Sequence, residues 1–318
     1  MDKKNVVYLF PGQGAQYPGM AVDLLSANAV KSLFETASEI FGKDAEELLK
    51  SDADTLKRTD VSQPAITLAN LAAAAFLGEQ GFAPAAAAGF SLGEYAALVS
   101  SGIITAADCF RLVKARGEAM QKTADNLREA SGGDASAAPG MAAIVGLAPD
   151  QVEELISKWT ADGVKDLYAA NINSPKQVVV AGTAAALTEA ENRFKEAGAK
   201  RVIRLQVAGP FHSPLMADSA EAFAPVLEAV SFSDPVIPVF SNVTGKQITS
   251  GEEAKKLALQ QITNPVRWVQ EQAAIAALGI GVCLEVGPGK VLQGLWKDSG
   301  SEHPIHAAGT AEDIGGLT

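Results

Sequence analysis

Residues 89–93 are Gly-Phe-Ser-Leu-Gly, and they follow a short apolar run and precede a helix-like run. In the pattern Gly-x-Ser-x-Gly the serine stands on a sharp strand-to-helix turn, which the glycines permit and which pushes the hydroxyl outward. The backbone N–H groups after the serine and the positive end of the helix dipole then face a reacting carbonyl. This context predicts an α/β fold with Ser91 as a nucleophile; the alternative is a tight glycine turn with an incidental serine.

A serine nucleophile needs a base, and the chain contains three histidines. His303 and His306 belong to a polar segment after Ser299, where we do not expect good order. His212 stands in Gly-Pro-Phe-His-Ser-Pro, a loop directly after an apolar strand-like run, which is a suitable position for a general base. We therefore pair Ser91 with His212, the alternative being that the histidine packs or caps.

The other polar residues of interest have two interpretations each. No acidic triad member stands out, because Asp218 and Asp234 both fit solvated surface charges; backbone carbonyls are the alternative means of orienting His212. Arg116 follows an apolar helical face. In one interpretation its aliphatic stem packs on that face while its charged head is solvated. In the other its guanidinium binds a substrate carboxylate.

The order of the predicted elements divides the chain into a large α/β body and an insertion. Strand-like and helix-like runs alternate in the order βαββαβ, the split motif of a ferredoxin-like unit, at 141–147, 149–161, 166–172, 177–181, 184–197 and 200–207. Loop-forming residues at 126–139 mark the boundary. We assign 128–208 to the small subdomain and 1–127 with 209–318 to the large one. Further strands of the large body are expected at 5–10, 85–90, 236–240 and 282–286, and helices at 64–77, from 92 onward, and at 252–261, 265–278 and 289–297.

Charge and composition exclude several classes of function. The formal net charge of −11 argues against nucleic acid or an anionic membrane as the main partner. Two cysteines do not make a disulfide framework, and the uncharged run 61–78 is expected to be a buried helix. With no signal peptide, metal cluster or nucleotide loop in the sequence, we expect a cytoplasmic, monomeric protein without a metal or a bound cofactor.

Several motifs together resemble one family, the malonyl-CoA:acyl carrier protein transacylases, which include the acyltransferase domains of polyketide synthases. They occur in the family's order from residue 8 to about residue 297. They are Phe10-Pro-Gly-Gln13-Gly, Gly-Phe-Ser91-Leu-Gly-Glu-Tyr, Ala-Arg116-Gly, Asn171-Ile-Asn173-Ser-Pro, Gly-Pro-Phe-His212-Ser, Gln261-Ile-Thr-Asn-Pro-Val-Arg-Trp and Glu285-Val-Gly-Pro-Gly-Lys.

The resemblance implies an α/β-hydrolase-like large subdomain with the inserted ferredoxin-like one, and a ping-pong transfer of malonyl from malonyl-CoA to acyl carrier protein. Ser91 would carry the malonyl ester and His212, held mainly by backbone carbonyls, would be the base. The backbone N–H groups of Gln13 and Leu92 would form the oxyanion hole, and Arg116 would bind the malonyl carboxylate. Further residues expected near the substrate are Met120, Gln261, Gln63, Asn171, Asn173 and Phe211. A phenylalanine at the last position accompanies malonyl in similar acyltransferases, whereas a serine accompanies methylmalonyl.

Two departures from the family and three alternatives accompany this interpretation. Phe90 stands where the family usually has histidine, and the loop 131–138 is longer than the family needs. The alternatives are a serine hydrolase or thioesterase that clears acyl groups, a polyketide acyltransferase that uses another extender unit, and a non-catalytic docking module. The sequence does not separate fatty acid from polyketide synthesis. Basic residues of the small subdomain are a candidate docking face for an acidic carrier protein: Arg193, Lys195, Lys200, Arg201 and Arg204.

Overall fold

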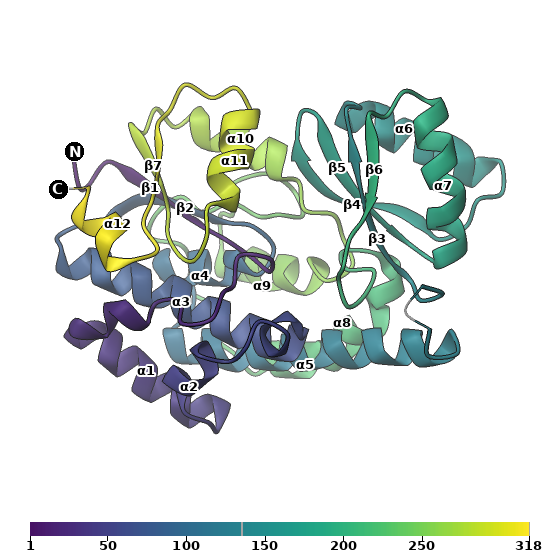
Figure 1. The fold of residues 1–318 in the computed structure, drawn as a ribbon. Helices are drawn as coiled ribbons and strands as arrows, with labels where there is room; N and C mark the ends of the chain where they lie inside the picture. The colour runs from purple at the N-terminus through teal and green to yellow at the C-terminus, as the bar shows by residue number, and fades with distance from the viewer. Residues whose placement is uncertain (135, 318) are drawn as a thin grey trace.

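The computed structural model describes residues 1–134 and 136–317, which form an α/β fold with two separate sheets (Figure 1). The first sheet is parallel, with strand order β2-β1-β7-β8. Its strands are β1 (Val6–Phe10), β2 (Pro84–Gly89), β7 (Val282–Glu285) and β8 (Ile305–Ala307). All five residues of β1 are buried, as expected for a strand with helices on both faces of its sheet.

Helices surround this sheet and complete the large body. They are α1 (Asn28–Phe41), α2 (Ala45–Leu49), α3 (Thr59–Glu79), α4 (Gly93–Ser100), α5 (Ala106–Ala130), α8 (Ala217–Glu228), α9 (Gly251–Gln260), α10 (Trp268–Ala276), α11 (Val291–Asp298) and α12 (Ala311–Gly315). Single 3₁₀ turns are η1 (Val22–Ser26), η2 (Thr55–Lys57) and η3 (Pro214–Met216). By length and apolarity α3 would suffice to cross a membrane, but 72% of its most apolar window is buried inside the molecule. It is the buried helix that the uncharged run predicts.

The second sheet is antiparallel, with strand order β4-β5-β3-β6, and lies beside the large body (Figure 1). Its elements follow the predicted order: β3 (Gly140–Val145), α6 (Pro149–Ala161), β4 (Leu167–Ser174), β5 (Gln177–Gly182), α7 (Ala184–Glu196) and β6 (Arg201–Arg204). Alternate residues of the sheet pack against α6 and α7 in a core of their own, where the rings of Trp159 and Phe194 meet with centroids 4.7 Å apart. The intervening residues, among them Met141 and Val179, join the core of the large body.

Two links position the small sheet over the large body. The backbone of β4 exchanges hydrogen bonds with Val266: Ile172 N–H donates to Val266 O at 2.8 Å, and Val266 N–H donates to Ala170 O at 2.9 Å. Helix α5 also runs from beneath the first sheet to beneath the second (Figure 1). The face between the two bodies is therefore fixed by backbone contacts and by one long helix.

Two expectations from the sequence are corrected. Residues 236–240 form no strand; Val239 and Phe240 make one isolated bridge each, to Ala87 and to Gln247, and Pro238 has no N–H to donate to a ladder. The described residues after Ser299, 300–317, are ordered: they form β8 and α12, and His306 lies in β8. The predicted boundary at 127/128 stays a prediction; it lies within α5, which ends at Ala130. The loop 131–138 includes Ala135, which lies outside the described residues.

Candidate active site

Ser91 stands at the turn between β2 and α4, with a positive φ of 52°. Flanking glycines make this turn possible. A Cβ on Gly93 would lie 2.0 Å from the carbonyl oxygen of Phe10, and one on Gly89 would lie 2.0 Å from the carbonyl carbon of Gly93. The backbones of β1, β2 and α4 thus approach one another too closely for any side chain, which is the physical reason for the Gly-x-Ser-x-Gly pattern.

His212 faces Ser91 across the turn. The Oγ of Ser91 lies 2.7 Å from Nε2 of His212, and Nδ1 of His212 lies 2.8 Å from the backbone oxygen of Gln261. A carbonyl only accepts, so Nδ1 carries the proton and Nε2 is left to accept the serine O–H. The orienting group is a carbonyl, one of the two possibilities left open by the sequence; Asp234 instead accepts from the N–H of Gly251.

Burial sets the charge of this histidine. His212 is 4% exposed, and desolvation, aided by the positive charge of Arg116, lowers its pKa to about 4. At neutral pH the imidazole is therefore uncharged and its Nε2 lone pair is available. A neutral, oriented imidazole at hydrogen-bonding distance from a hydroxyl is the arrangement that general base chemistry requires.

In a Glu94→Gln variant, which removes a neighbouring carboxyl whose pKa burial raises to about 7, we expect the acylation rate of Ser91 to change by less than about twofold between pH 7.5 and pH 6. The reason is that a histidine with a pKa near 4 stays neutral over that range. A histidine with the ordinary pKa of about 6.5 would be only about one-quarter neutral at pH 6. Rapid-quench kinetics with an acyl-CoA donor measures the rate. The unmodified protein, measured alongside, shows how much pH dependence Glu94 adds; a fourfold fall in the variant would contradict the prediction.

Arg116, on α5, is a buried cation that forms no ion pair within the described residues, and Glu94 is a carboxyl near enough for its charge to act on it. Its side chain is 1% exposed, its Nη2 donates to Oε1 of Gln261 at 2.9 Å, and its guanidinium lies 5.5 Å from the ring centroid of Tyr95. Its Nε has no hydrogen-bond partner, and among the described residues no carboxylate lies within 4.0 Å of it. A buried charge is costly unless it is paired, so this geometry calls for an anionic group on a ligand.

A buried polar network that sequence reasoning missed holds the turn in place. The N–H of Ser91 donates to Oδ1 of Asn242 at 2.7 Å, and the N–H of Asn242 donates to Oε2 of Glu94 at 2.8 Å. The Nε2 of Gln261 donates to the backbone oxygen of Ser91 and to Glu94, both at 3.0 Å. Burial raises the pKa of Glu94 to about 7. Glu94 stands inside the serine motif and could have been singled out; Asn242 comes from a distant loop, and only the fold brings it here.

The side chains of Ser91, His212 and Arg116 open onto one cavity of about 300 Å³ between the two bodies. Most of the other expected residues also line it: Gln13, Leu92, Met120, Asn171, Asn173 and Phe211. Gln63 and Gln261 do not. Gln63 lies behind the wall, where its Nε2 contacts Sδ of Met120 at 3.3 Å, and Gln261 holds Arg116 and His212 from outside.

Two further features of the cavity bear on its chemistry. Within the described residues, no acceptor lies within hydrogen-bonding distance of the backbone N–H groups of Gln13 and Leu92. Phe90, where the related family has histidine, also lines the cavity and packs edge-on against Trp268 with centroids 5.5 Å apart. The cavity thus combines a hydroxyl with its base, two free N–H donors, a buried cation and an apolar wall.

Comparisons with known proteins place this site in context. The family model described as acyl transferase domain matches residues 7–315. The malonyl CoA-acyl carrier protein transacylase of Bacillus subtilis is 37% identical over 295 residues, which cover 92% of this chain and 90% of the relative. A crystal structure of the enzyme abbreviated MCAT from Streptococcus pneumoniae matches with a TM-score of 0.89 at 34% identity over 98% of both chains. A malonyl-transacylase solved in complex with its type II polyketide synthase acyl-carrier protein matches with a TM-score of 0.87 at 35% identity over 97% of both chains.

Proposed function

The chain belongs to the acyl transferase domain family, and from this premise we propose that it transfers malonyl from malonyl-CoA to the phosphopantetheine thiol of acyl carrier protein. The observation that carries the proposal is the hydroxyl–imidazole pair of Ser91 and His212, 2.7 Å apart, in one cavity with the unpaired cation of Arg116. The pair supplies acyl transfer, and the cation supplies the preference for an acyl group that bears a carboxylate.

The first half of the reaction forms the ester. The Oγ of Ser91 attacks the thioester carbonyl carbon while Nε2 of His212 takes its proton. The oxyanion that develops accepts hydrogen bonds from the N–H groups of Gln13 and Leu92, which donate to no acceptor among the described residues. The C–S bond then breaks, and the imidazolium returns the proton to the departing thiolate of coenzyme A. The buried carbonyl of Gln261 keeps the ring oriented throughout.

The second half reverses these steps with another thiol. The phosphopantetheine thiol of the carrier protein gives its proton to Nε2 of His212 and attacks the malonyl ester. Collapse of the oxyanion breaks the bond to Oγ of Ser91, which recovers the proton. Every step uses groups of this chain and its two substrates, so we propose that no bound cofactor takes part.

The architecture supports a finer description of the two bodies. We propose that the parallel sheet with its serine turn is an α/β-hydrolase-like subdomain and that β3 to β6 with α6 and α7 form a ferredoxin-like insertion. The element order βαββαβ and the sheet order β4-β5-β3-β6 support the second assignment. Because α5 continues to Ala130, we propose that the insertion begins after that residue.

An intact-mass measurement tests the proposed function. The protein is mixed with malonyl-CoA in the absence of carrier protein, with Ser91→Ala as the control. We expect a malonyl adduct that requires Ser91, persists, and disappears when holo acyl carrier protein is added. Free malonate without a lasting adduct would instead indicate a hydrolase, and no reaction from a folded protein would indicate another acyl group or a docking module.

Phe211 provides a prediction about the acyl group. Its ring is buried and lines the cavity beside the base, so a methyl branch on the malonyl carbon would meet it. We expect Phe211→Ser to raise kcat/KM for methylmalonyl-CoA relative to malonyl-CoA by about tenfold or more, the scale of one methyl group in a fitted pocket. Competition between the two donors, read by mass spectrometry, measures the ratio. A ratio equal to that of the unmodified protein would count against this steric account.

A further inference from the structure

A second cavity of about 600 Å³ adjoins the one that contains Ser91. The two cavities share four lining residues, Lys57, Leu205, Gln206 and Val207. The second cavity lies between the last turns of α5, the start of α3 and the segment that returns from β6 to the large body. A ligand whose reactive end lies at Ser91 therefore has a continuous path into the second cavity.

The walls of the second cavity carry an excess of positive charge. Lys57, Arg58 and Arg128 line it, against one carboxylate, that of Asp125. This local charge contrasts with the net charge of −11 of the whole chain. An excess of cations in a recess attracts anionic groups and raises their local concentration.

The cations retain free donors. Arg128 donates from Nη2 to Asp125 at 3.0 Å, and Arg58 donates from Nε and Nη2 to Asp60. Lys57 donates from Nζ to Asp54 at 2.8 Å; Asp54 and Asp60 lie outside the lining. The side chains of Arg58 and Arg128 are 53% and 52% exposed, so these ion pairs are screened and weak. The guanidinium N–H groups that the pairs do not use are available to a ligand.

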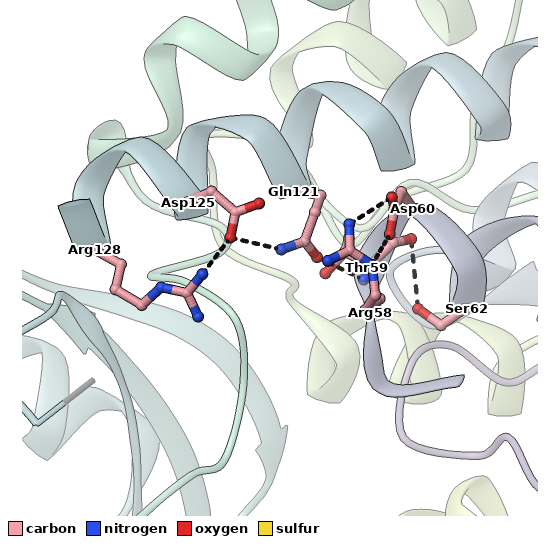
Figure 2. Close-up of polar contacts among 7 residues, drawn as sticks. All are labelled: Arg58, Thr59, Asp60, Ser62, Gln121, Asp125 and Arg128. Atoms are coloured by element: carbon pink, nitrogen blue, oxygen red, sulfur yellow. Dashed lines mark hydrogen bonds and ion pairs between the residues drawn. The ribbon is translucent and has the colours of Figure 1, made fainter. Parts of the chain in front are cut away.

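A chain of hydrogen bonds links Arg128 to the start of α3, next to Arg58 (Figure 2). The Oε1 of Gln121 accepts a hydrogen bond at 2.8 Å from the N–H of Thr59, the first residue of α3. The Nε2 of Gln121 donates to Oδ1 of Asp125 at 3.1 Å. Arg128 donates to that same oxygen. The last turns of α5 are thus tied to the start of α3, where Arg58 stands. Because the two helix ends are tied together, the backbone positions that carry Arg58 and Arg128 are set before any ligand arrives.

We propose that this second cavity binds the phosphate groups of the coenzyme A nucleotide, an inference that rests on the proposed function. With the thioester at Ser91, the pantetheine arm would pass the shared residues and the nucleotide phosphates would meet Arg58 and Arg128. Guanidinium groups match phosphate with paired, charge-assisted hydrogen bonds. A cavity of about 600 Å³ is large enough for a nucleotide.

Calorimetry on the Ser91→Ala background tests the proposal without turnover, with coenzyme A and pantetheine as the two ligands. We expect coenzyme A to bind more tightly than pantetheine, and Arg128→Gln to weaken coenzyme A about tenfold while leaving pantetheine unchanged. The matched control is Arg111→Gln, on the same helix. Arg111 pairs with Asp108 three residues earlier, as Arg128 does with Asp125, but lies outside the cavity. This control should bind both ligands as the parent does.

Three results would overturn the proposal. The first is that Arg128→Gln binds coenzyme A as tightly as the parent. The second is that Arg128→Gln weakens the binding of pantetheine as much as that of coenzyme A. The third is that Arg111→Gln weakens the binding of coenzyme A to the same extent. A raised KM for the carrier protein with unchanged binding of coenzyme A would assign the cations to carrier docking instead. Failure of the proposed function is seen separately, as the absence of a Ser91 adduct from malonyl-pantetheine, which lacks the nucleotide.

Discussion

Replacement of His212 by alanine is expected to lower kcat/KM for malonyl transfer by about 10⁴-fold or more. Nε2 of His212 lies 2.7 Å from Oγ of Ser91, and in the described part of the chain no other base is hydrogen-bonded to that hydroxyl. Without the imidazole, the hydroxyl keeps its proton and attacks slowly. The oxyanion donors and the cation of Arg116 remain, so substrate binding should change much less than the chemical step.

The measurement is single-turnover formation of the Ser91 adduct from malonyl-CoA. His306→Ala is the matched control, because that histidine is exposed on β8 and contributes nothing to the cavity lining; we expect it to react as the unmodified protein does. Thermal unfolding of both variants checks that the buried position tolerates the change. An alanine variant at 212 that is folded and reacts within tenfold of the parent would mean that another group takes the proton.

Replacement of Arg116 by alanine is expected to lower kcat/KM for malonyl-CoA by about 10²- to 10³-fold, the scale for removing one member of a desolvated charge pair. The kcat/KM for acetyl-CoA should not fall in this variant. The acetyl group has no carboxylate to pair with Arg116, so it leaves the buried guanidinium unpaired in the parent as well. The preference for malonyl over acetyl should therefore largely disappear. The physical basis is the 1% exposure of Arg116 and the absence of any carboxylate within ion-pairing distance among the described residues.

Competition between malonyl-CoA and acetyl-CoA, read as the ratio of the two adducts on Ser91, measures this preference. Arg111→Ala is the control, since it removes an exposed arginine from the same helix. A fall of equal size for both donors would show that Arg116 supports the fold of the site rather than the choice of acyl group. An unchanged ratio would mean that the carboxylate binds elsewhere.

The parts of the fold that could be predicted from the sequence are those with local causes. The serine turn follows from Gly89 and Gly93, whose missing side chains allow three backbone segments to meet. The order of elements in the small body follows from their own periodicity, and α6 begins at Pro149 because proline suits the first turn of a helix. The sequence leaves open whether the head of Arg116 is solvated or binds a substrate carboxylate, because periodicity does not measure desolvation.

The parts that could not be predicted depend on contacts between distant segments. Asn242 accepts a hydrogen bond from the N–H of Ser91, 151 residues earlier in the chain, and no local sequence pattern predicts this contact. Residues 236–240 are apolar enough for a strand, yet they make only two isolated bridges, at Val239 and Phe240, because Pro238 has no N–H to donate to a ladder. The segment after Ser299 is polar and still ordered, because β8 pairs with β7 and the ring N–H of Trp296 donates to the backbone of His303.

The carbonyl of Gln261 that orients His212 belongs to the main chain, and this affects how the site responds to mutation. A carboxylate in that role disappears with one codon change, whereas a peptide oxygen is present whatever side chain occupies the position. Substitutions at 261 therefore change the side-chain hydrogen bonds to Arg116 and Glu94 but leave the acceptor for Nδ1 of His212 in place. Only a change in the path of the backbone, such as an insertion after α9, would remove it. The orientation of the base is thus robust to point substitution, while acyl selectivity remains free to evolve.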